Sequence, residues 1–520
     1  MTLPNLGSAD FLPLLPAISL TVGAILVLLG EVFLVSQNRG FQSLLALVST
    51  AVAGLLSLSM LSEAPRAVFL DMAVLDPFSS LLSFVVCLGL FLSILISRGH
   101  LQHRNAERGE FYALMLFAGA GMSLLAISSE LITLFINLEV LSISTYVLTS
   151  YLRRGTRHAE AGFKYFILGA FAAALMLYGA ALLYGATGTT KLHEMAGPLE
   201  RAMEMQPALV YCAFGLLLAG FAFKVAAVPF HMWTPDVYEG APTPVTALMS
   251  AGVKTAAFAA LVRVFLVLSP AMNPQVPFLV FSLLAALTMV GGNLMALPQR
   301  NVKRMLAYSS IAHAGYLLLG VAVLFARPGA GDSEGGVLGL TPLLSGASGP
   351  LAQESFRGIL FYLLGYTVTA VGAFGIMAAL ERREDEEKGT AWDLDRFAGL
   401  AQRKPGFALA MALFMLSLGG IPPTVGFLGK LFIFKSAVDA GLVGLSILGV
   451  LSSAAGVYYY LRVVVYMYMR PAPEGAQAPE RDWMTDVAVA ASTVAVVVLG
   501  FLPAPVSQWL SMAGVLFQGR

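Results

Sequence analysis

Long apolar segments follow one another along almost the whole chain, and this is the feature that most limits its possible folds. A run of about 20 apolar residues is long enough to cross a lipid bilayer as a helix. Only 12% of the 520 residues are charged, about half the share that is usual in soluble domains. So few charges cannot cover a water-soluble surface, and the composition therefore predicts an all-α polytopic membrane protein.

The apolar runs predict fourteen transmembrane helices. They lie near residues 13–34, 41–61, 75–97, 111–128, 131–151, 161–185, 207–235, 243–268, 277–297, 304–325, 356–380, 406–438, 441–469 and 484–503. No basic stretch precedes the first run, so we expect a permanent span and not a cleaved signal.

Lysine and arginine are distributed unevenly between alternate connections. The odd-numbered connections hold 18 of these residues, whereas the even-numbered connections and the C-terminal tail together hold 6. Because positively charged loops remain in the cytoplasm, the odd connections are predicted to be cytoplasmic and both termini external. Two connections are long: residues 326–355, which are rich in glycine and serine, are predicted to be an external loop, and residues 381–405 a solvated cytoplasmic loop.

Five ionisable residues lie well inside predicted spans: Glu139, Lys224, Lys254, His313 and Lys430. Each charge at this depth costs about 2.5–3.5 kcal/mol on insertion scales. Such groups are tolerated where they face an internal, partly hydrated path and interact with one another. A lysine holds its proton beside a carboxylate and releases it more readily when the two are apart. The set therefore favours proton transfer across the membrane.

Four further cations, Lys164, Arg263, Lys435 and Arg462, lie near the ends of spans, where their long side chains are expected to reach the interface. The sequence contains no motif that indicates nucleotide binding, cysteine-based redox or metal chemistry, or nucleic-acid binding. Glycine-rich nucleotide motifs and paired-cysteine motifs are missing from the sequence, its only two cysteines are far apart, and its net charge of +1 does not favour nucleic acid. We expect no metal site and no bound cofactor in this chain.

Two of the runs are too long for one straight span and contain proline. Residues 207–235 include Pro229 just after Lys224, and residues 406–438 include Pro422 and Pro423 ahead of Lys430. Proline breaks or kinks a helix, so both spans are predicted to be discontinuous, as in transporters built from inverted repeats.

The two interrupted spans are five spans apart, so we predict two inverted five-helix repeats, spans 4–8 and 9–13. The predicted units are an N-terminal three-helix segment (1–106), the first repeat (107–272), the second repeat (273–470) and a C-terminal helix (471–520).

Three segments resemble a known family. They are "PFHMWTPDVYEGAPTPVTALMSAGVKTAAFAALVRVF" from Pro229 to Phe265, "EAGFKYFILGAFAAALMLYGAALLYGATGTT" from Glu160 to Thr190, and "SLGGIPPTVGFLGKLFIF" from Ser417 to Phe434. Together they resemble the antiporter-like membrane subunits of respiratory complex I, and within these the bacterial subunit N family. The resemblance extends over roughly residues 70–470.

The resemblance implies roles for single residues. Glu139 matches the fifth-span glutamate that pairs with the seventh-span lysine, which is Lys224 here. Lys254 matches the eighth-span lysine, which is thought to connect to the cytoplasmic side.

In the second half, Lys430 matches the twelfth-span lysine, which is thought to lead to the periplasmic side. His313 matches a polar relay residue between the halves, and Lys164 matches a sixth-span lysine of less certain role.

The function that the resemblance implies is proton translocation driven by quinone reduction elsewhere in an NADH-quinone oxidoreductase. Its partners are the other membrane-arm subunits, which together with the rest of the complex hold quinone, FMN, NADH and iron–sulfur clusters. Two alternatives stay open: a subunit of an Mrp-type cation/proton antiporter or a membrane-bound hydrogenase, and a scaffold without transport. The subunit N wording argues against the first, and the charges inside the spans argue against the second.

Overall fold

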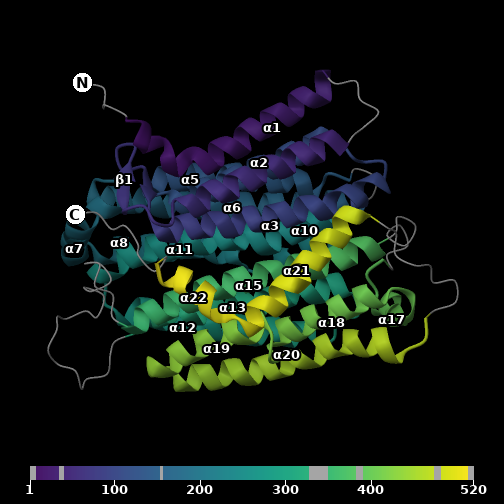
Figure 1. The fold of residues 1–520 in the computed structure, drawn as a ribbon. Coiled ribbons are helices and arrows are strands. Elements are labelled where there is room, and N and C mark those ends of the chain that lie inside the picture. Colours follow the sequence, from purple (N-terminus) through teal and green to yellow (C-terminus); the bar gives the residue numbers. More distant parts are fainter. Residues whose placement is uncertain are drawn as a thin grey trace.

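The computed structural model describes residues 7–33, 40–152, 156–326, 350–381, 391–472 and 482–512. Within these ranges, thirteen helices are long and apolar enough to cross a membrane. They lie side by side with their axes roughly aligned (Figure 1). The predicted all-α polytopic membrane fold is confirmed.

The long helices and the pieces of interrupted spans form the body of the molecule. They are α1 (Leu15–Phe33), α2 (Gly40–Ser59), α3 (Pro77–Gln102), α4 (Gly109–Ile127), α5 (Leu131–Thr149), α6 (Thr156–Thr187), α8 (Pro207–Val225), α10 (Thr243–Leu248), α11 (Lys254–Leu268), α12 (Gln275–Ala296), α13 (Val302–Val323), α15 (Pro350–Leu380), α18 (Pro405–Gly419), α19 (Val425–Asp439), α20 (Val443–Met469) and α21 (Trp483–Phe501). A π-helical turn, η3 (Met249–Val253), joins α10 to α11 without a break in the span.

Short elements connect the long helices. They are η1 (Ser8–Leu14), the antiparallel hairpin of β1 (Arg66–Val68) and β2 (Ala73–Leu75), η2 (Leu192–Glu194), α7 (Ala196–Met205), α9 (Trp233–Gly240), η4 (Ser269–Ala271), η5 (Leu394–Phe397), α17 (Leu400–Arg403) and α22 (Pro503–Met512). The helix α1 begins toward the end of the molecule that carries β1 and α7, and α22 lies toward the same end (Figure 1).

Three spans form the centre of the bundle. In the most apolar part of the spans 243–271, 302–323 and 351–380, 94% of the residues are buried, against 39% in α6 and 33% in α21. The central spans contain α11, α13 and α15, and α11 and α13 carry Lys254 and His313. Two of the five ionisable residues predicted to be functional therefore lie in the most enclosed part of the molecule.

Two predicted runs are each divided into two helices. The run 207–235 becomes α8 followed by α9, and the run 406–438 becomes α18 and α19. Because α18 is only 15 residues long, it is not among the thirteen candidate spans. The predicted external loop 326–355 falls largely on residues 327–349, which lie outside the described residues. Of the predicted cytoplasmic loop 381–405, residues 382–390 also lie outside the described residues. The rest of that loop is not simply solvated, because it contains η5 and α17, and Trp392, Leu394 and Leu400 are buried.

Arg263, a cation near a span end, is buried among the helices and has a carboxylate partner that the sequence did not predict. Its Nη2 atom is 2.9 Å from Asp76 Oδ2, and both side chains are buried. Asp76 also accepts a hydrogen bond from Ser79 N and so caps the start of α3. Arg263 Nη2 also donates to the Ser79 hydroxyl at 2.7 Å, so the ion pair and this hydrogen bond together hold α11 against α3.

Removing one partner of this pair is expected to destabilise the protein. In an Arg263→Ala variant Asp76 loses its counter-ion, and breaking a buried pair costs about 3–5 kcal/mol. The denaturation midpoint of the purified protein measures the loss. The matched control is Arg300→Ala, because Arg300 and its partner Asp395 are 72% and 57% exposed and such pairs contribute about 0–1 kcal/mol. Equal midpoints for the two variants would contradict this account.

Candidate functional site

The first interruption lies directly after Lys224. Helix α8 ends at Val225, and Ala226 has a left-handed conformation with φ of 61°. Ala226 N donates to the Phe223 carbonyl and Ala227 N to the Ala222 carbonyl, which is the hydrogen-bond pattern of a Schellman helix end. Pro229 lies in the turn that follows.

Side chains from other helices satisfy the backbone groups that this interruption frees. Trp233, the first residue of α9, donates from its indole nitrogen to the Phe223 carbonyl at 2.9 Å. Val228 N donates to the Thr288 hydroxyl of α12 at 3.0 Å. These contacts are needed because unsatisfied backbone groups inside a membrane cost several kcal/mol each.

The second interruption has the same helix-end geometry. Gly420 follows α18 with φ of 78°, its N–H donates to the Ser417 carbonyl, and Ile421 N donates to the Leu416 carbonyl. Pro422 and Pro423 lie between α18 and α19. The two lysines lie on opposite sides of the interruptions. Lys224 precedes the first interruption, whereas Lys430 follows the second.

Lys224 donates from Nζ to the Ser142 hydroxyl of α5 at 2.7 Å. Three aromatic rings surround the ammonium group, with the centroids of Tyr146, Tyr165 and Phe223 at 5.4, 5.5 and 5.8 Å. Rings at this distance attract a cation through their quadrupoles. The ammonium is therefore held by one hydroxyl and by aromatic faces.

Glu139 lies one helical turn before Ser142 on α5. It is half-buried, and its buried Oε1 atom has no hydrogen-bond partner. In the part of the chain that the structure describes, Glu139 and Lys224 form no ion pair, and Ser142 occupies the position of the expected carboxylate. The structure thus shows no direct contact between these two residues.

Lys254 follows the π-helical turn η3, a feature that is often found at functional sites. Its Nζ atom donates to both the carbonyl and the hydroxyl oxygen of Ser310 on α13, each at 2.5 Å. The ring of Tyr366 lies 5.2 Å from the same atom. The side chain is 2% exposed, so no part of the ammonium reaches the outside of the bundle.

Lys430 binds the C-terminal end of α18. Its Nζ atom donates to the Leu418 carbonyl at 2.9 Å, to the Gly419 carbonyl at 3.1 Å and to the Ser453 hydroxyl of α20 at 2.8 Å. The carbonyl end of a helix carries partial negative charge. The interruption therefore supplies the acceptors that make a buried ammonium tolerable here.

His313 lies between two tyrosines. Its Nδ1 atom is 2.5 Å from Tyr362 Oη and its Nε2 atom is 3.1 Å from Tyr460 Oη. Neither tyrosine was predicted from the sequence, and neither were Ser142 and Ser310. Hydroxyl side chains are common in membrane helices, so no local signal distinguishes these four.

Lys164 lies at the edge of the bundle. It is paired with Glu160 at 2.7 Å and with Asp236 of α9 at 2.8 Å, and its side chain is 40% exposed. Asp236 also binds Arg304 of α13 at 2.7 Å. The structure therefore places Lys164 in an ion-pair network that holds α9, and not beside the buried lysines.

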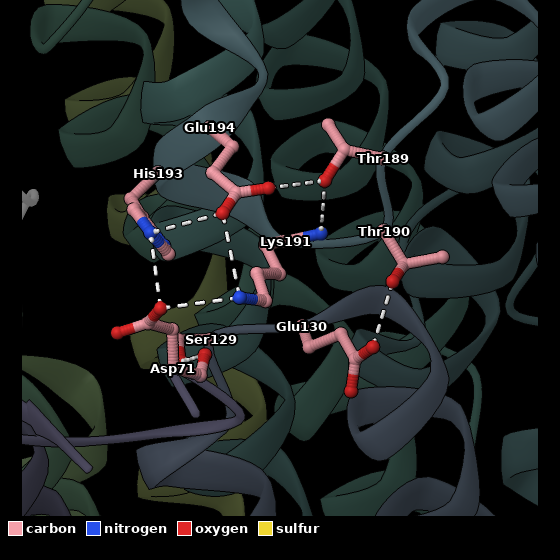
Figure 2. A network of polar contacts seen from close by, with 8 residues as sticks. All are labelled: Asp71, Ser129, Glu130, Thr189, Thr190, Lys191, His193 and Glu194. Carbon is pink, nitrogen blue, oxygen red and sulfur yellow. Dashed lines mark hydrogen bonds and ion pairs between the residues drawn. The ribbon is translucent and has the colours of Figure 1, made fainter. Parts of the chain in front are cut away.

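A second polar cluster lies outside the spans (Figure 2). Lys191 Nζ is 3.2 Å from Asp71 Oδ2 and 3.3 Å from Glu194 Oε1, and His193 contacts the same two carboxylates. The Asp71 carboxylate raises the pKa of Lys191, and the Thr189 hydroxyl, which donates to Glu194, lowers the pKa of that carboxyl. Asp71, His193 and Glu194 are close enough together to hold a metal ion. However, the positive charge of Lys191 already balances the charge of the carboxylates.

Comparison with known proteins identifies the family. The chain matches the protein family described as "NADH:quinone oxidoreductase/Mrp antiporter, TM" over residues 128–328 and 342–456. It is 66% identical to NADH-quinone oxidoreductase subunit N of Myxococcus xanthus, over 99% of this chain and 100% of that one. The chain belongs to the subunit N family of NADH-quinone oxidoreductases.

Solved structures agree with this family. A chain in respiratory complex I from Thermus thermophilus with bound aureothin is 34% identical, has a TM-score of 0.76, and matches over 96% of this chain and 99% of its own. A chain in the Mrp complex from Dietzia sp. has a TM-score of 0.78 at 21% identity, over 97% and 96% of the two chains, which shows a shared fold only. The resemblance to subunit N is therefore confirmed, and the Mrp-type alternative is not favoured.

The helix end at Gly420 is expected to control the position of Lys430. A Cβ atom at Gly420 would lie 2.8 Å from Lys430 Cδ, and a left-handed conformation costs a residue with a Cβ roughly 1–2 kcal/mol. Gly420→Ala should therefore lower the denaturation midpoint of the purified protein. Ala226→Gly is the matched control at the other interruption, where removal of Cβ relieves the strain, and it should keep or raise the midpoint. A loss in both variants would refute this explanation.

Proposed function

We propose that this chain translocates protons across the membrane as a membrane-arm subunit of an NADH-quinone oxidoreductase. Lys224, Lys254 and Lys430 carry the protons, His313 relays them between the two halves of the molecule, and Glu139 modulates Lys224. Lys164 has a lesser role, to hold α9 beside the interruption. The proposal extends the family membership to the residues of this chain.

The observation that carries the proposal is the kind of partner that each buried lysine has. Within the described residues, the Nζ atoms of Lys224, Lys254 and Lys430 donate only to hydroxyl and carbonyl oxygens, and none contacts a carboxylate. A carboxylate partner would hold the proton on the ammonium.

Buried arginine provides the comparison. Arg263 is paired with Asp76 at 2.9 Å and Arg104 with Glu381 at 2.8 Å. Arginine does not lose its proton in proteins, so these pairs are permanent structural contacts. Lysine without a counter-ion can exchange its proton, and this difference separates the proposed proton carriers from the structural charges.

The other parts of the proposal concern orientation and assembly. We propose a bacterial plasma membrane as the location, with both termini on the external side, and two inverted five-helix repeats at 107–272 and 273–470. Lys254 then connects to the cytoplasmic side and Lys430 to the periplasmic side. Oxidation of NADH, the FMN and iron–sulfur groups and quinone reduction belong to partner subunits.

Loss of Lys224 tests the proposal. A Lys224→Ala variant lacks an exchangeable proton beside the first interruption, so proton pumping should fall by roughly tenfold or more, since a positioned acid–base group contributes about 10²–10⁴ in rate. NADH-driven acidification of inside-out membrane vesicles, followed with a pH-sensitive dye, measures the rate.

The matched control is Lys435→Ala. Lys435 is 54% exposed, is paired with Glu354 and Asp439, and lies five residues after Lys430 on α19. Its removal should leave pumping unchanged. Wild-type pumping by an assembled complex with Lys224→Ala would exclude the proposed role.

Lys430 allows a graded test. A protonated carboxyl group at this position can donate to the Leu418 or Gly419 carbonyl, whereas alanine can do neither this nor proton exchange. Lys430→Glu should therefore retain more pumping than Lys430→Ala in the same vesicle assay. If the two variants lose pumping equally, the site needs a positive charge and not an exchangeable proton.

A further inference from the structure

The imidazole of His313 forms a continuous unit with two phenol groups from other helices. Tyr362 comes from α15 and Tyr460 from α20, while His313 lies on α13. All three side chains are buried, with 2–3% exposure. Both ring nitrogens face a hydroxyl group, at 2.5 and 3.1 Å, and a hydroxyl can act as donor or as acceptor.

On one side, the unit continues toward Lys254. Tyr460 Oη shares a hydrogen bond with Ser309 Oγ. The next residue, Ser310, accepts from the Lys254 ammonium. The end of the unit at Ser309 therefore lies one residue along α13 from the partner of the eighth-span lysine.

On the other side, the unit borders a small cavity that is also lined by Leu418, a residue that binds Lys430. His313, Tyr362, Ser417 and Leu418 are among the residues that line this small cavity, which has room for about one water molecule. The Leu418 carbonyl also accepts from Lys430. The tyrosine hydroxyls, the imidazole and the cavity therefore lie between the residues that bind Lys254 and those that bind Lys430.

We propose that Tyr362 and Tyr460 are proton-conducting residues, which together with His313 form a reversible chain between Lys254 and Lys430. This inference rests on the proposed function and specifies how its relay step works. Ser309, Tyr460, His313 and Tyr362 each have one hydrogen to donate and at least one lone pair to accept, so the whole chain can point in either direction.

The transfer is balanced and leaves every hydroxyl and imidazole group of the chain neutral. The Lys254 ammonium gives up a proton and becomes a neutral amine; this proton binds Ser309 Oγ, and the former Ser309 hydrogen passes to Tyr460 Oη. The Tyr460 hydrogen forms an N–H bond at His313 Nε2 while the bond at Nδ1 breaks and its proton passes to Tyr362 Oη.

The Tyr362 hydrogen then passes to a water molecule in the cavity, which transfers a proton to Lys430; Lys430 accepts it as a neutral amine and becomes an ammonium. One proton has been taken up and one released, the imidazole tautomer is inverted, and no electrons have moved. Rotation of the hydroxyl groups and return of the tautomer reset the chain.

A neutral chain fits this position better than a further charged residue. Lys254 and Lys430 are both buried, and a third permanent cation between them would add desolvation cost and repulsion. The phenols also fix the plane of the imidazole, since each nitrogen has a partner on a different helix.

The experiment compares three tyrosine-to-phenylalanine variants of the intact complex in vesicles. Tyr362→Phe and Tyr460→Phe keep the ring and remove one link, so protons pumped per NADH oxidised should fall, with a roughly tenfold or greater drop in pumping rate. The control is Tyr112→Phe. Tyr112 of α4 is equally buried, but its hydroxyl donates to Glu107 Oε1 at 3.1 Å and lies outside the chain, so pumping should stay at the wild-type rate.

A structural role is distinguished by His313→Gln. The glutamine amide can still bond to both phenols but cannot pass a proton from one atom to the other, so this variant should keep the wild-type denaturation midpoint and lose pumping. Equal losses of pumping in Tyr112→Phe and the other two phenylalanine variants would overturn the inference. Wild-type pumping in Tyr362→Phe and Tyr460→Phe would also overturn it.

The result for Lys224→Ala separates this inference from the proposed function. If Lys224→Ala abolishes pumping while Tyr362→Phe and Tyr460→Phe pump normally, the chain through His313 is wrong and the proposed function stands. If Lys224→Ala pumps normally, the proposed function itself fails, whatever the tyrosine variants do.

Discussion

The placement of an ammonium group inside a membrane-spanning bundle is the constraint on which the rest of this structure depends. Such a group must find oxygen acceptors without acquiring a carboxylate that would hold its proton permanently. The three buried lysines meet this requirement in different ways. Lys224 has a serine hydroxyl and aromatic rings, Lys254 has the carbonyl and hydroxyl of one serine, and Lys430 has the carbonyl end of a helix.

The interruptions of α8 and of α18–α19 follow from the same constraint. A continuous helix uses its own carbonyls, whereas a helix end leaves carbonyls free to accept from a side chain. At α18 the free carbonyls bind Lys430 directly. At α8 the Phe223 carbonyl accepts from Trp233, and the lysine points instead toward α5. Both ends use a left-handed residue, Ala226 or Gly420, which is the most compact way to stop a helix and satisfy its last groups.

The sequence is sufficient to predict most of the spans, the interruptions and the burial of Lys224, Lys254, His313 and Lys430, because charge and proline are rare in apolar runs and therefore conspicuous. It is not sufficient to predict their partners. Ser142, Tyr362 and Tyr460 look like ordinary span residues, and only the packing of separate helices brings them to Lys224 and His313. Arg263 shows the same limit of the sequence. Its position near a span end suggested an interfacial side chain, whereas its ion pair with Asp76 holds it inside the bundle. The π-helical turn before Lys254 has no sequence signal that we recognise.

The different roles of charged and neutral groups explain why the buried lysines are so few. Each lysine needs its own set of acceptors, so lysines have to be spaced apart, and a proton then has to cross the distance between them. Hydroxyl and imidazole groups can fill that distance without a charge of their own, since each both donates and accepts. The centre of the bundle, between Lys254 and Lys430, contains such groups: His313, Tyr362, Tyr460 and Ser309. On the proposed function, charge is placed where a proton rests, and the positions through which it only passes are neutral.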